Sequence, residues 1–302
     1  MNYMKRTNFF TWMCGATFLL TTVIACGDDS KQEKEPEDPN LNPAETFYPG
    51  EVKPHAYIKC FAGAYYRKVV SSKDYWTGIK GKVTLPVITF DENRKNPAKP
   101  QQYLDNPSVY MGGNANGQET DIGMTWEVIR DENGVVSPDR RAFRPFLRRT
   151  GYTPTGQTKL YINAPAESRY YWYEGDEITM SLEMVRDGVL LFIVEGENKR
   201  YKQEFECAGY RFGSKIEFKR VNAIDQVSNE GKPAQPTKTM VENSTWHYTN
   251  LLRDYKSEIV ESPMHEKRFT NMRCPDIKHF KVETNETALK KGGEVISIYG
   301  QK

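Results

Sequence analysis

The chain has 302 residues, of which 27% are charged, and its formal net charge is only +2. This length fits one large domain or two small ones, and the mild charge argues against nucleic acid as a partner. The most apolar stretch, at the start of the chain, is too short and wrongly flanked for a transmembrane helix.

That first stretch predicts a secretory signal peptide over residues 1–25. Lys5 and Arg6 form a short basic region, and residues 9–24 are mostly apolar. The run ends in Val23-Ile24-Ala25-Cys26, which resembles a bacterial lipobox. The resemblance implies that Cys26 is diacylated and becomes the mature N-terminus, so the expected partner is a membrane reached through a lipid anchor.

Residues 26–50 are expected to form a disordered tether. The segment contains four prolines and a net charge of −5, and it has too few apolar residues to offset its chain entropy. The acidic pair Asp28-Asp29 follows the lipobox cysteine closely and resembles the surface-export signal of Bacteroidetes lipoproteins. That resemblance implies a lipid-anchored outer-membrane protein facing the cell exterior.

Residues 51–302 are expected to form one β-sandwich domain with a charge of +5. This part contains Cys60, Cys207 and Cys274, which leaves two arrangements open: one disulfide with a free thiol, or three buried thiols. No Cys and His spacing supports a metal site, and no motif indicates a cofactor, so we expect neither.

The first half of this domain reads as strands separated by polar turns. We expect strands at residues 56–70, 82–90, 121–130 and 140–149, a surface loop at 91–107 and a flexible turn at 111–117. In the third strand Ile122, Met124 and Trp126 share one face, while Asp121 and Glu127 share the other.

Residues 140–149 carry five arginines with aromatic residues between them. Such a pattern could provide a surface for RNA or another polyanion. We favour the alternative, in which the arginines are solvated or pair with neighbouring acidic side chains.

A hairpin over residues 174–196 is the clearest local prediction. Asp187-Gly188 separates two apolar runs, which is a strong hairpin signal, and a type I′ turn is expected there. Pairing the strands from that turn places Leu182 opposite Ile193 and Glu183 opposite Phe192. Leu182 would then face the core, and Phe192 would lie on the opposite side of the sheet.

The rest of the chain continues as strands with few helices. We expect strands at residues 201–207, 215–221, 245–252, 280–284 and 294–299, a long loop at 228–240 and a single helical turn at 287–291. The fold class predicted from these elements is all-β, a two-sheet antiparallel sandwich.

The run from residue 121 through 149 to the hairpin, with Tyr173-Glu174-Gly175-Asp176 before it, resembles the concanavalin A-like or laminin G-like jelly roll. The resemblance implies two curved antiparallel sheets with a concave face that often binds glycans or peptides.

Within that fold, Glu119-Thr120-Asp121 resembles the first half of the Glu-x-Asp-x-x-Glu signature of family 16-type glycoside hydrolases. Met124 occupies the position of the closing Glu, so the acid/base residue is missing. Because retaining hydrolysis needs two carboxyl groups about 5 Å apart, we expect no catalysis of this type.

The function expected from the sequence is therefore non-catalytic binding of an extracellular glycan or other polymer by a surface lipoprotein. The alternatives are a structural or adhesive surface protein and a glycan-degrading enzyme with an unrecognised site. The candidate ligand contacts are an aromatic and acidic set: Trp172, Glu183, Phe192, Trp246, Asp121 and Glu127.

Overall fold

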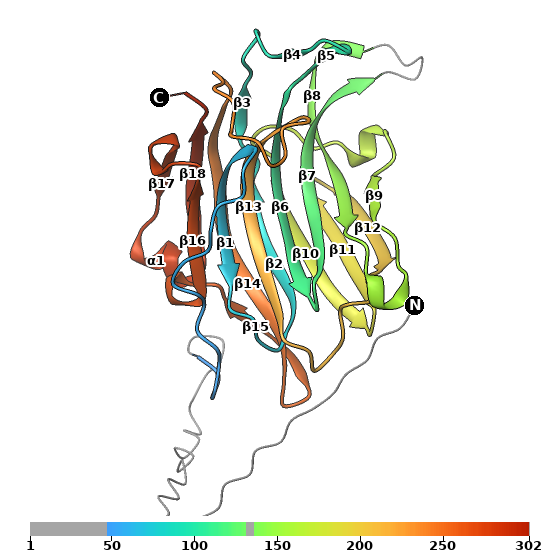
Figure 1. The fold of residues 1–302 in the computed structure, drawn as a ribbon, viewed down its shortest axis with the longest axis vertical. Helices are drawn as coiled ribbons and strands as arrows, with labels where there is room; N and C mark the ends of the chain where they lie inside the picture. Colours follow the sequence, from blue (N-terminus) through green and yellow to red (C-terminus); the bar gives the residue numbers. More distant parts are fainter. Residues whose placement is uncertain (1–46, 131–135, 302) are drawn as a thin grey trace, which may run out of the picture. The chain divides into compact units, whose positions relative to one another are not determined.

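The computed structural model describes residues 47–130 and 136–301, which form two antiparallel β-sheets packed face to face (Figure 1). The expected signal peptide, Cys26 and residues up to 46 of the expected tether lie outside the described residues. Tyr48 is only 3% exposed, so the folded body begins before the boundary that we expected at residue 51. Within the described part of the chain, no helix is long and apolar enough to cross a membrane.

The first sheet has seven strands. In spatial order they are β16 (Phe269–Cys274), β1 (Ala64–Ser71), β13 (Ile216–Gln226), β6 (Asp105–Ala115), β7 (Gln118–Arg130), β8 (Val136–Arg149) and β9 (Leu160–Asn163).

The second sheet has nine strands. Its main path is β12 (Lys199–Glu206), β11 (Val189–Gly196), β10 (Glu177–Arg186), β2 (Trp76–Thr84), β14 (Met240–Tyr255), β18 (Glu294–Tyr299) and β17 (Phe280–Glu283). Two further strands pair with β14, namely β15 (Glu258–Pro263) and β3 (Val87–Thr89). A separate small hairpin joins β4 (Lys95–Asn96) to β5 (Lys99–Tyr103), and α1 (Glu286–Lys290) is a short helix.

The chain passes repeatedly from one sheet to the other. It leaves β1 for β2, returns with β6 to β9, crosses again for β10 to β12, and then alternates through β13, β14 and β16. Neighbouring strands in space are thus often distant in sequence, as in a jelly roll. The predicted fold class, an all-β two-sheet antiparallel jelly-roll sandwich, is confirmed.

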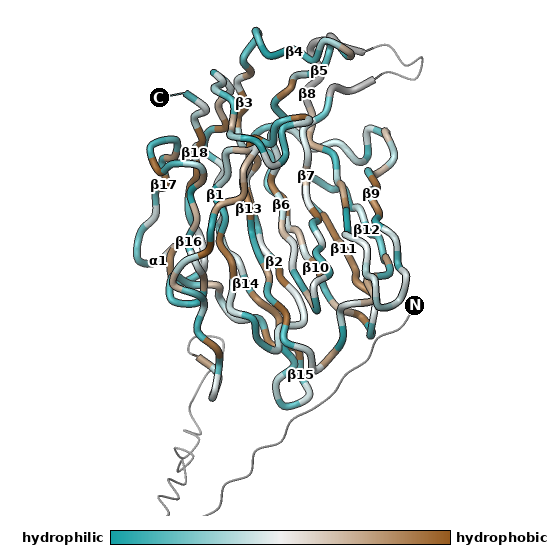
Figure 2. The backbone as a smooth tube through the Cα atoms, in the orientation of Figure 1, coloured by the Kyte–Doolittle hydropathy of each residue, from teal (hydrophilic) through white to brown (hydrophobic). Residues whose placement is uncertain are grey.

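The core lies between the two sheets and follows from the alternation of side chains along each strand. In β7, Ile122 and Met124 are fully buried, and Asp121 lies on the other face. Hydrophobic residues are concentrated along strand β11 (Figure 2). Three tryptophans fill the core with at most 1% exposure: Trp76, Trp172 and Trp246.

The predicted hairpin forms, but its register differs by one residue. Asp187 and Gly188 connect β10 to β11, yet only Gly188 has a positive φ, at 74°, so the turn is not type I′. The pairing shifts between Met184 and Arg186, and Phe192 therefore pairs with Leu182 rather than with Glu183. Such a bulge moves a side chain to the other face, so our placement of Phe192 away from the core was wrong.

The glycine-rich segment at residues 111–117 was also misassigned. Residues up to 115 belong to strand β6, and only Asn116-Gly117 forms the turn into β7. Met111 is fully buried between the sheets. Gly112, the next residue, has no side chain and so lets neighbouring side chains come close to the strand, instead of forming a flexible loop.

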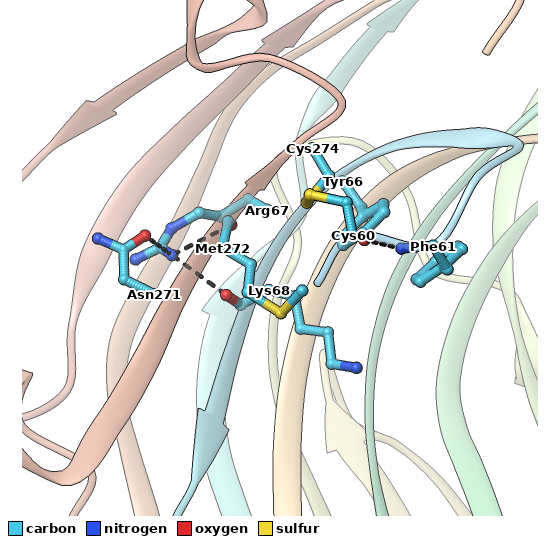
Figure 3. The surroundings of a disulfide bond; sticks show 8 residues. All are labelled: Cys60, Phe61, Tyr66, Arg67, Lys68, Asn271, Met272 and Cys274. Atoms are coloured by element: carbon cyan, nitrogen blue, oxygen red, sulfur yellow. Dashed lines mark hydrogen bonds between the residues drawn. A yellow bond between two sulfur atoms is a disulfide. The ribbon is translucent and has the colours of Figure 1, made fainter. Parts of the chain in front are cut away.

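An N-terminal strap, residues 51–63, lies against β16 and β1. Glu51 at its start pairs with Arg268, and both side chains are fully buried. At its other end Cys60 forms a disulfide with Cys274, and the Phe61 ring stacks on Tyr66 at 4.1 Å (Figure 3). Strap residues therefore cover part of the outer face of the seven-stranded sheet.

This disulfide settles the question that the cysteine count left open. Cys207 remains a free thiol and is buried, and burial raises the pKa of that thiol to about 12. A thiol with so high a pKa is unreactive at neutral pH, so Cys207 serves as a small core residue.

Candidate functional site

The outer face of the seven-stranded sheet holds a groove made of two adjacent pockets. The main pocket has a volume of about 300 Å³ and contains Asp121, Arg148 and Asp225 in its lining. The side pocket has a volume of about 190 Å³. Both pockets are lined by Asn106, Thr125 and Tyr161, so they adjoin one another.

A charged cluster forms part of the floor, and its geometry follows from strand register. Lys219 on β13 pairs with Gly112 on β6, which in turn pairs with Asp121 on β7. Because Gly112 has no side chain, Lys219 Nζ reaches across the intervening strand to within 2.8 Å of Asp121 Oδ1. A Cβ at Gly112 would lie 2.0 Å from the Thr120 carbonyl oxygen, so this position requires glycine.

Asp121 and Lys219 both keep their charges. Burial alone would raise the pKa of Asp121, but the positive charges of Lys219 and Arg148 outweigh burial and hold that pKa below its ordinary value. Burial would likewise lower the pKa of Lys219, yet Asp121 and Glu119 raise it. The cluster is thus a neutralised ion network rather than a free charged surface.

Lys68, on the neighbouring strand β1, is affected differently. Burial and the charge of Lys219 lower its pKa to about 8. Part of the Lys68 population is therefore neutral in mildly alkaline solution, where it can accept a hydrogen bond as well as donate one.

Asp225 on β13 is the other acidic group of the main pocket, and its surroundings differ from those of Asp121. Its Oδ2 accepts a hydrogen bond of 2.7 Å from Ser108, and no ion pair with a cation joins it within the described residues. Burial, reinforced by the negative charge of Asp121, raises the pKa of Asp225 to about 6. Asp225 can therefore hold or release a proton near neutral pH.

Asp121 and Asp225 do not lie side by side. Asp121 is level with Lys219, and Asp225 lies six positions further along β13 than Lys219. At about 3.4 Å per residue, their Cα atoms are roughly 20 Å apart along the strand direction. This arrangement is not the close carboxylate pair of a retaining glycosidase.

Aromatic rings stand at the rim of the main pocket. Tyr161 is 58% exposed and stacks on Phe146 at a centroid distance of 6.2 Å. Phe61, from the N-terminal strap, is 48% exposed and also lines the pocket. Exposed ring faces beside polar groups are a surface that the C–H faces of a sugar can pack against.

Two of the residues proposed from the sequence lie in this groove. Asp121 lines the main pocket, and Glu127 lines the side pocket. Glu127 pairs with Arg144, and Asp121 pairs with Arg148. For these two arginines, the expected pairing with acidic neighbours is confirmed.

The other four proposed contacts lie elsewhere. Trp172, Phe192 and Trp246 are at most 1% exposed and belong to the core between the sheets. The two indole N–H groups are already used, since Trp172 donates to the Gly196 carbonyl and Trp246 donates to Asn222. Glu183 is half-buried on the nine-stranded sheet and lines neither pocket.

Sequence reasoning missed Asp225, Ser108, Tyr110 and Tyr161. A signal was present for Asp225, because it is a lone acidic residue in the otherwise apolar and neutral stretch at residues 221–227. Tyr110 is buried in the pocket floor, and burial raises its pKa well above the ordinary value. Nothing local distinguishes Ser108 or Tyr161 from ordinary strand residues.

No family model matches the chain, and no curated protein matches it. Solved structures with a similar fold include scytalido-glutamic peptidase with a transition state analog inhibitor. It is 9% identical, with a TM-score of 0.46, over 78% of this chain and 98% of the peptidase.

The alginate lyase from Klebsiella pneumoniae is 10% identical, with a TM-score of 0.35, over 56% of this chain and 60% of the lyase. A glycoside hydrolase family 16 endo-glucanase from Bacteroides ovatus is 13% identical, with a TM-score of 0.32, over 58% and 77% of the two chains. These are distant similarities of fold, and they carry no conclusion about activity.

Proposed function

We propose that this protein binds an extracellular glycan in the groove on the outer face of its seven-stranded sheet, without cleaving it. The observation that carries the proposal is the combination of exposed rings, Tyr161 and Phe61, with a polar floor in one pocket of about 300 Å³. Rings pack against sugar C–H faces, and the floor groups exchange hydrogen bonds with hydroxyls.

The state of the floor supports binding rather than hydrolysis. The Asp121 carboxylate already interacts with Lys219 and Arg148, so it is not free to act as a nucleophile. Asp225 accepts a hydrogen bond from Ser108, and no hydrogen bond joins it to Asp121 within the described residues. A rigid, internally paired floor suits recognition, because little side-chain freedom is lost when a ligand binds.

A glycan array tests the proposal, using a soluble chain that lacks residues 1–26. We expect binding to at least one polysaccharide, and calorimetry with that glycan should show at least a tenfold loss of affinity for Tyr161→Ala. The matched control is Tyr173→Ala, because Tyr173 is 41% exposed but lines neither pocket. Equal effects of the two changes would refute the assignment of the groove.

Glycan cleavage is a second candidate, and one observation favours it. The pKa of Asp225 is about 6, which suits a general acid that is protonated in mildly acidic solution. If Asp225 donates a proton to a leaving group, new reducing ends should appear faster below pH 6 than above it. Asp225→Asn should abolish their formation. A polysaccharide bound for hours without new reducing ends rules this candidate out.

We also propose that the protein is held on the outer membrane, facing outward, by a lipid on Cys26. The support is the sequence alone: a basic region, an apolar run, Ala25-Cys26 and the acidic pair Asp28-Asp29. Cys26→Ala should remain unprocessed and leave the membrane fraction. Replacing both aspartates with Ala should retain acylation but lower protease accessibility on intact cells.

A further inference from the structure

The side pocket is continuous with the main pocket but has its own chemistry. The stacked rings of Phe90 and Tyr103, 4.1 Å apart, lie near it, and Trp126 lies 4.5 Å from Phe90. Tyr103 and Trp126 line the side pocket itself. The side pocket thus has an aromatic wall, as the main pocket has at its rim.

Two buried polar atoms of residues that line the side pocket have no hydrogen-bond partner within the described residues. They are the indole donor Trp126 Nε1 and the amide acceptor Asn163 Oδ1. A buried polar group without a hydrogen-bond partner costs about 1–3 kcal/mol, and such groups are rare in native proteins. Both atoms are buried at the pocket wall, and a ligand hydroxyl that reaches them would satisfy one donor and one acceptor.

The charges of the side pocket are already balanced. Arg144 pairs with Glu127, and Arg94 pairs with Asp105. In the main pocket, Arg148 pairs with Asp121 and Glu119. Among the described residues that line the two pockets, both arginines are paired in this way, so an uncharged chain fits the groove better than a polyanionic one.

The pocket sizes indicate how the ligand extends. A pocket of about 190 Å³ is smaller than the 300–1,000 Å³ typical of small-molecule sites, whereas the two pockets together fall within that range. Because they share Asn106, Thr125 and Tyr161, one extended molecule can occupy both.

We infer that the side pocket is a second subsite, which binds the neighbouring unit of the same uncharged glycan chain. This inference rests on the proposed function of the main pocket. Tyr161 stands between the subsites and contributes to both. The protein therefore recognises the interior of a neutral polysaccharide rather than a single sugar.

The test uses a ladder of oligosaccharides, one to six units long, prepared from the neutral glycan that scores highest on the array. Calorimetry with the chain lacking residues 1–26 should show affinity rising about tenfold between one unit and the length that fills both subsites. Trp126→Phe keeps a ring but removes the N–H, and Asn163→Ala removes the acceptor. Trp126→Phe should lower affinity for long oligosaccharides to that for short ones and leave short ones unaffected. Asn163→Ala should weaken both, because Asn163 also shares a hydrogen bond with Tyr161 of the main pocket.

Glu183→Gln serves as the control, because Glu183 lies on the other sheet, and a melting curve for each variant verifies folding. If both variants bind long oligosaccharides as tightly as the unchanged protein, the second subsite does not exist. The same conclusion follows if affinity does not depend on length, or if oligogalacturonate binds better than the neutral ladder. Failure of every oligosaccharide and polysaccharide to bind would instead overturn the proposed function itself.

Discussion

Asp225→Asn should stabilise the protein at neutral pH, which is unusual for the loss of a charged group. The carboxyl has a pKa of about 6 in the folded chain, against an ordinary value of 3.8. Folding therefore favours the neutral form, and the ionised form is tolerated only at a cost. Asparagine resembles the neutral carboxyl in shape and can still accept the Ser108 hydrogen bond.

The size and pH range of the effect follow from that shift. About two pKa units correspond to about 3 kcal/mol, an upper bound because Asp225 is partly exposed. Well below the ordinary pKa of 3.8 the carboxyl is protonated in both the folded and unfolded states, so nothing is lost there. Between about pH 4 and pH 6 the unfolded chain loses this proton while the folded chain keeps it, so the stability falls as the pH rises, and the full loss is reached above pH 6.

Urea denaturation at pH 4 and pH 8 measures this difference. We expect the variant to gain about 1–3 kcal/mol at pH 8 and less than about 1 kcal/mol at pH 4. Asp121→Asn is the matched contrast, because the pKa of Asp121 is lowered, and it should lose about 3–5 kcal/mol at pH 8. A gain for Asp225→Asn that is equal at both pH values, or a loss at pH 8, would refute the reasoning.

Three further predictions concern the framework of the groove and can be measured by denaturation. Gly112→Ala should lose at least 2 kcal/mol and much of its glycan binding, because the new Cβ would lie 2.0 Å from the Thr120 carbonyl oxygen; a melting curve like that of the unchanged protein would contradict the register. Cys60→Ser removes a disulfide that spans 214 residues and should cost about 2–5 kcal/mol; full stability under reducing conditions would show that the strap holds without it. Leu182→Ala should lose about 2–5 kcal/mol, whereas Glu183→Ala should change stability by less than about 1 kcal/mol; similar losses would mean that the faces of β10 are assigned wrongly.

Local sequence was a good guide where an element depends on its own residues. The strand at residues 294–299 has the predicted bounds, and the helical turn expected at 287–291 appears as α1 (Glu286–Lys290). Asp187-Gly188 forms a turn at the predicted position, although its type differs from the predicted type I′. In these cases alternation, capping or turn residues lie within a few positions of one another, so a short window contains the whole signal.

Register depends on a different kind of information. A bulge between Met184 and Arg186 places Phe192 in the core, and the alternation of residues in the hairpin did not predict this bulge. In the folded chain β10 also pairs with β2, and Leu182 and Phe192 both pack into the core between the sheets. That packing is set by residues about a hundred positions away.

The sequence by itself determined the strand-rich fold class, the turn at Asp187-Gly188 and the two groove acids Asp121 and Glu127, because each is encoded in local alternation. Only the tertiary structure decided that Asp225 and Asp121, 104 positions apart, line one pocket, and that tryptophans which resemble sugar platforms fill the core instead. The physical reason is that a groove is made by strands distant in sequence. The burial and the pKa of each groove residue are set by the neighbouring strands as well as by its own side chain.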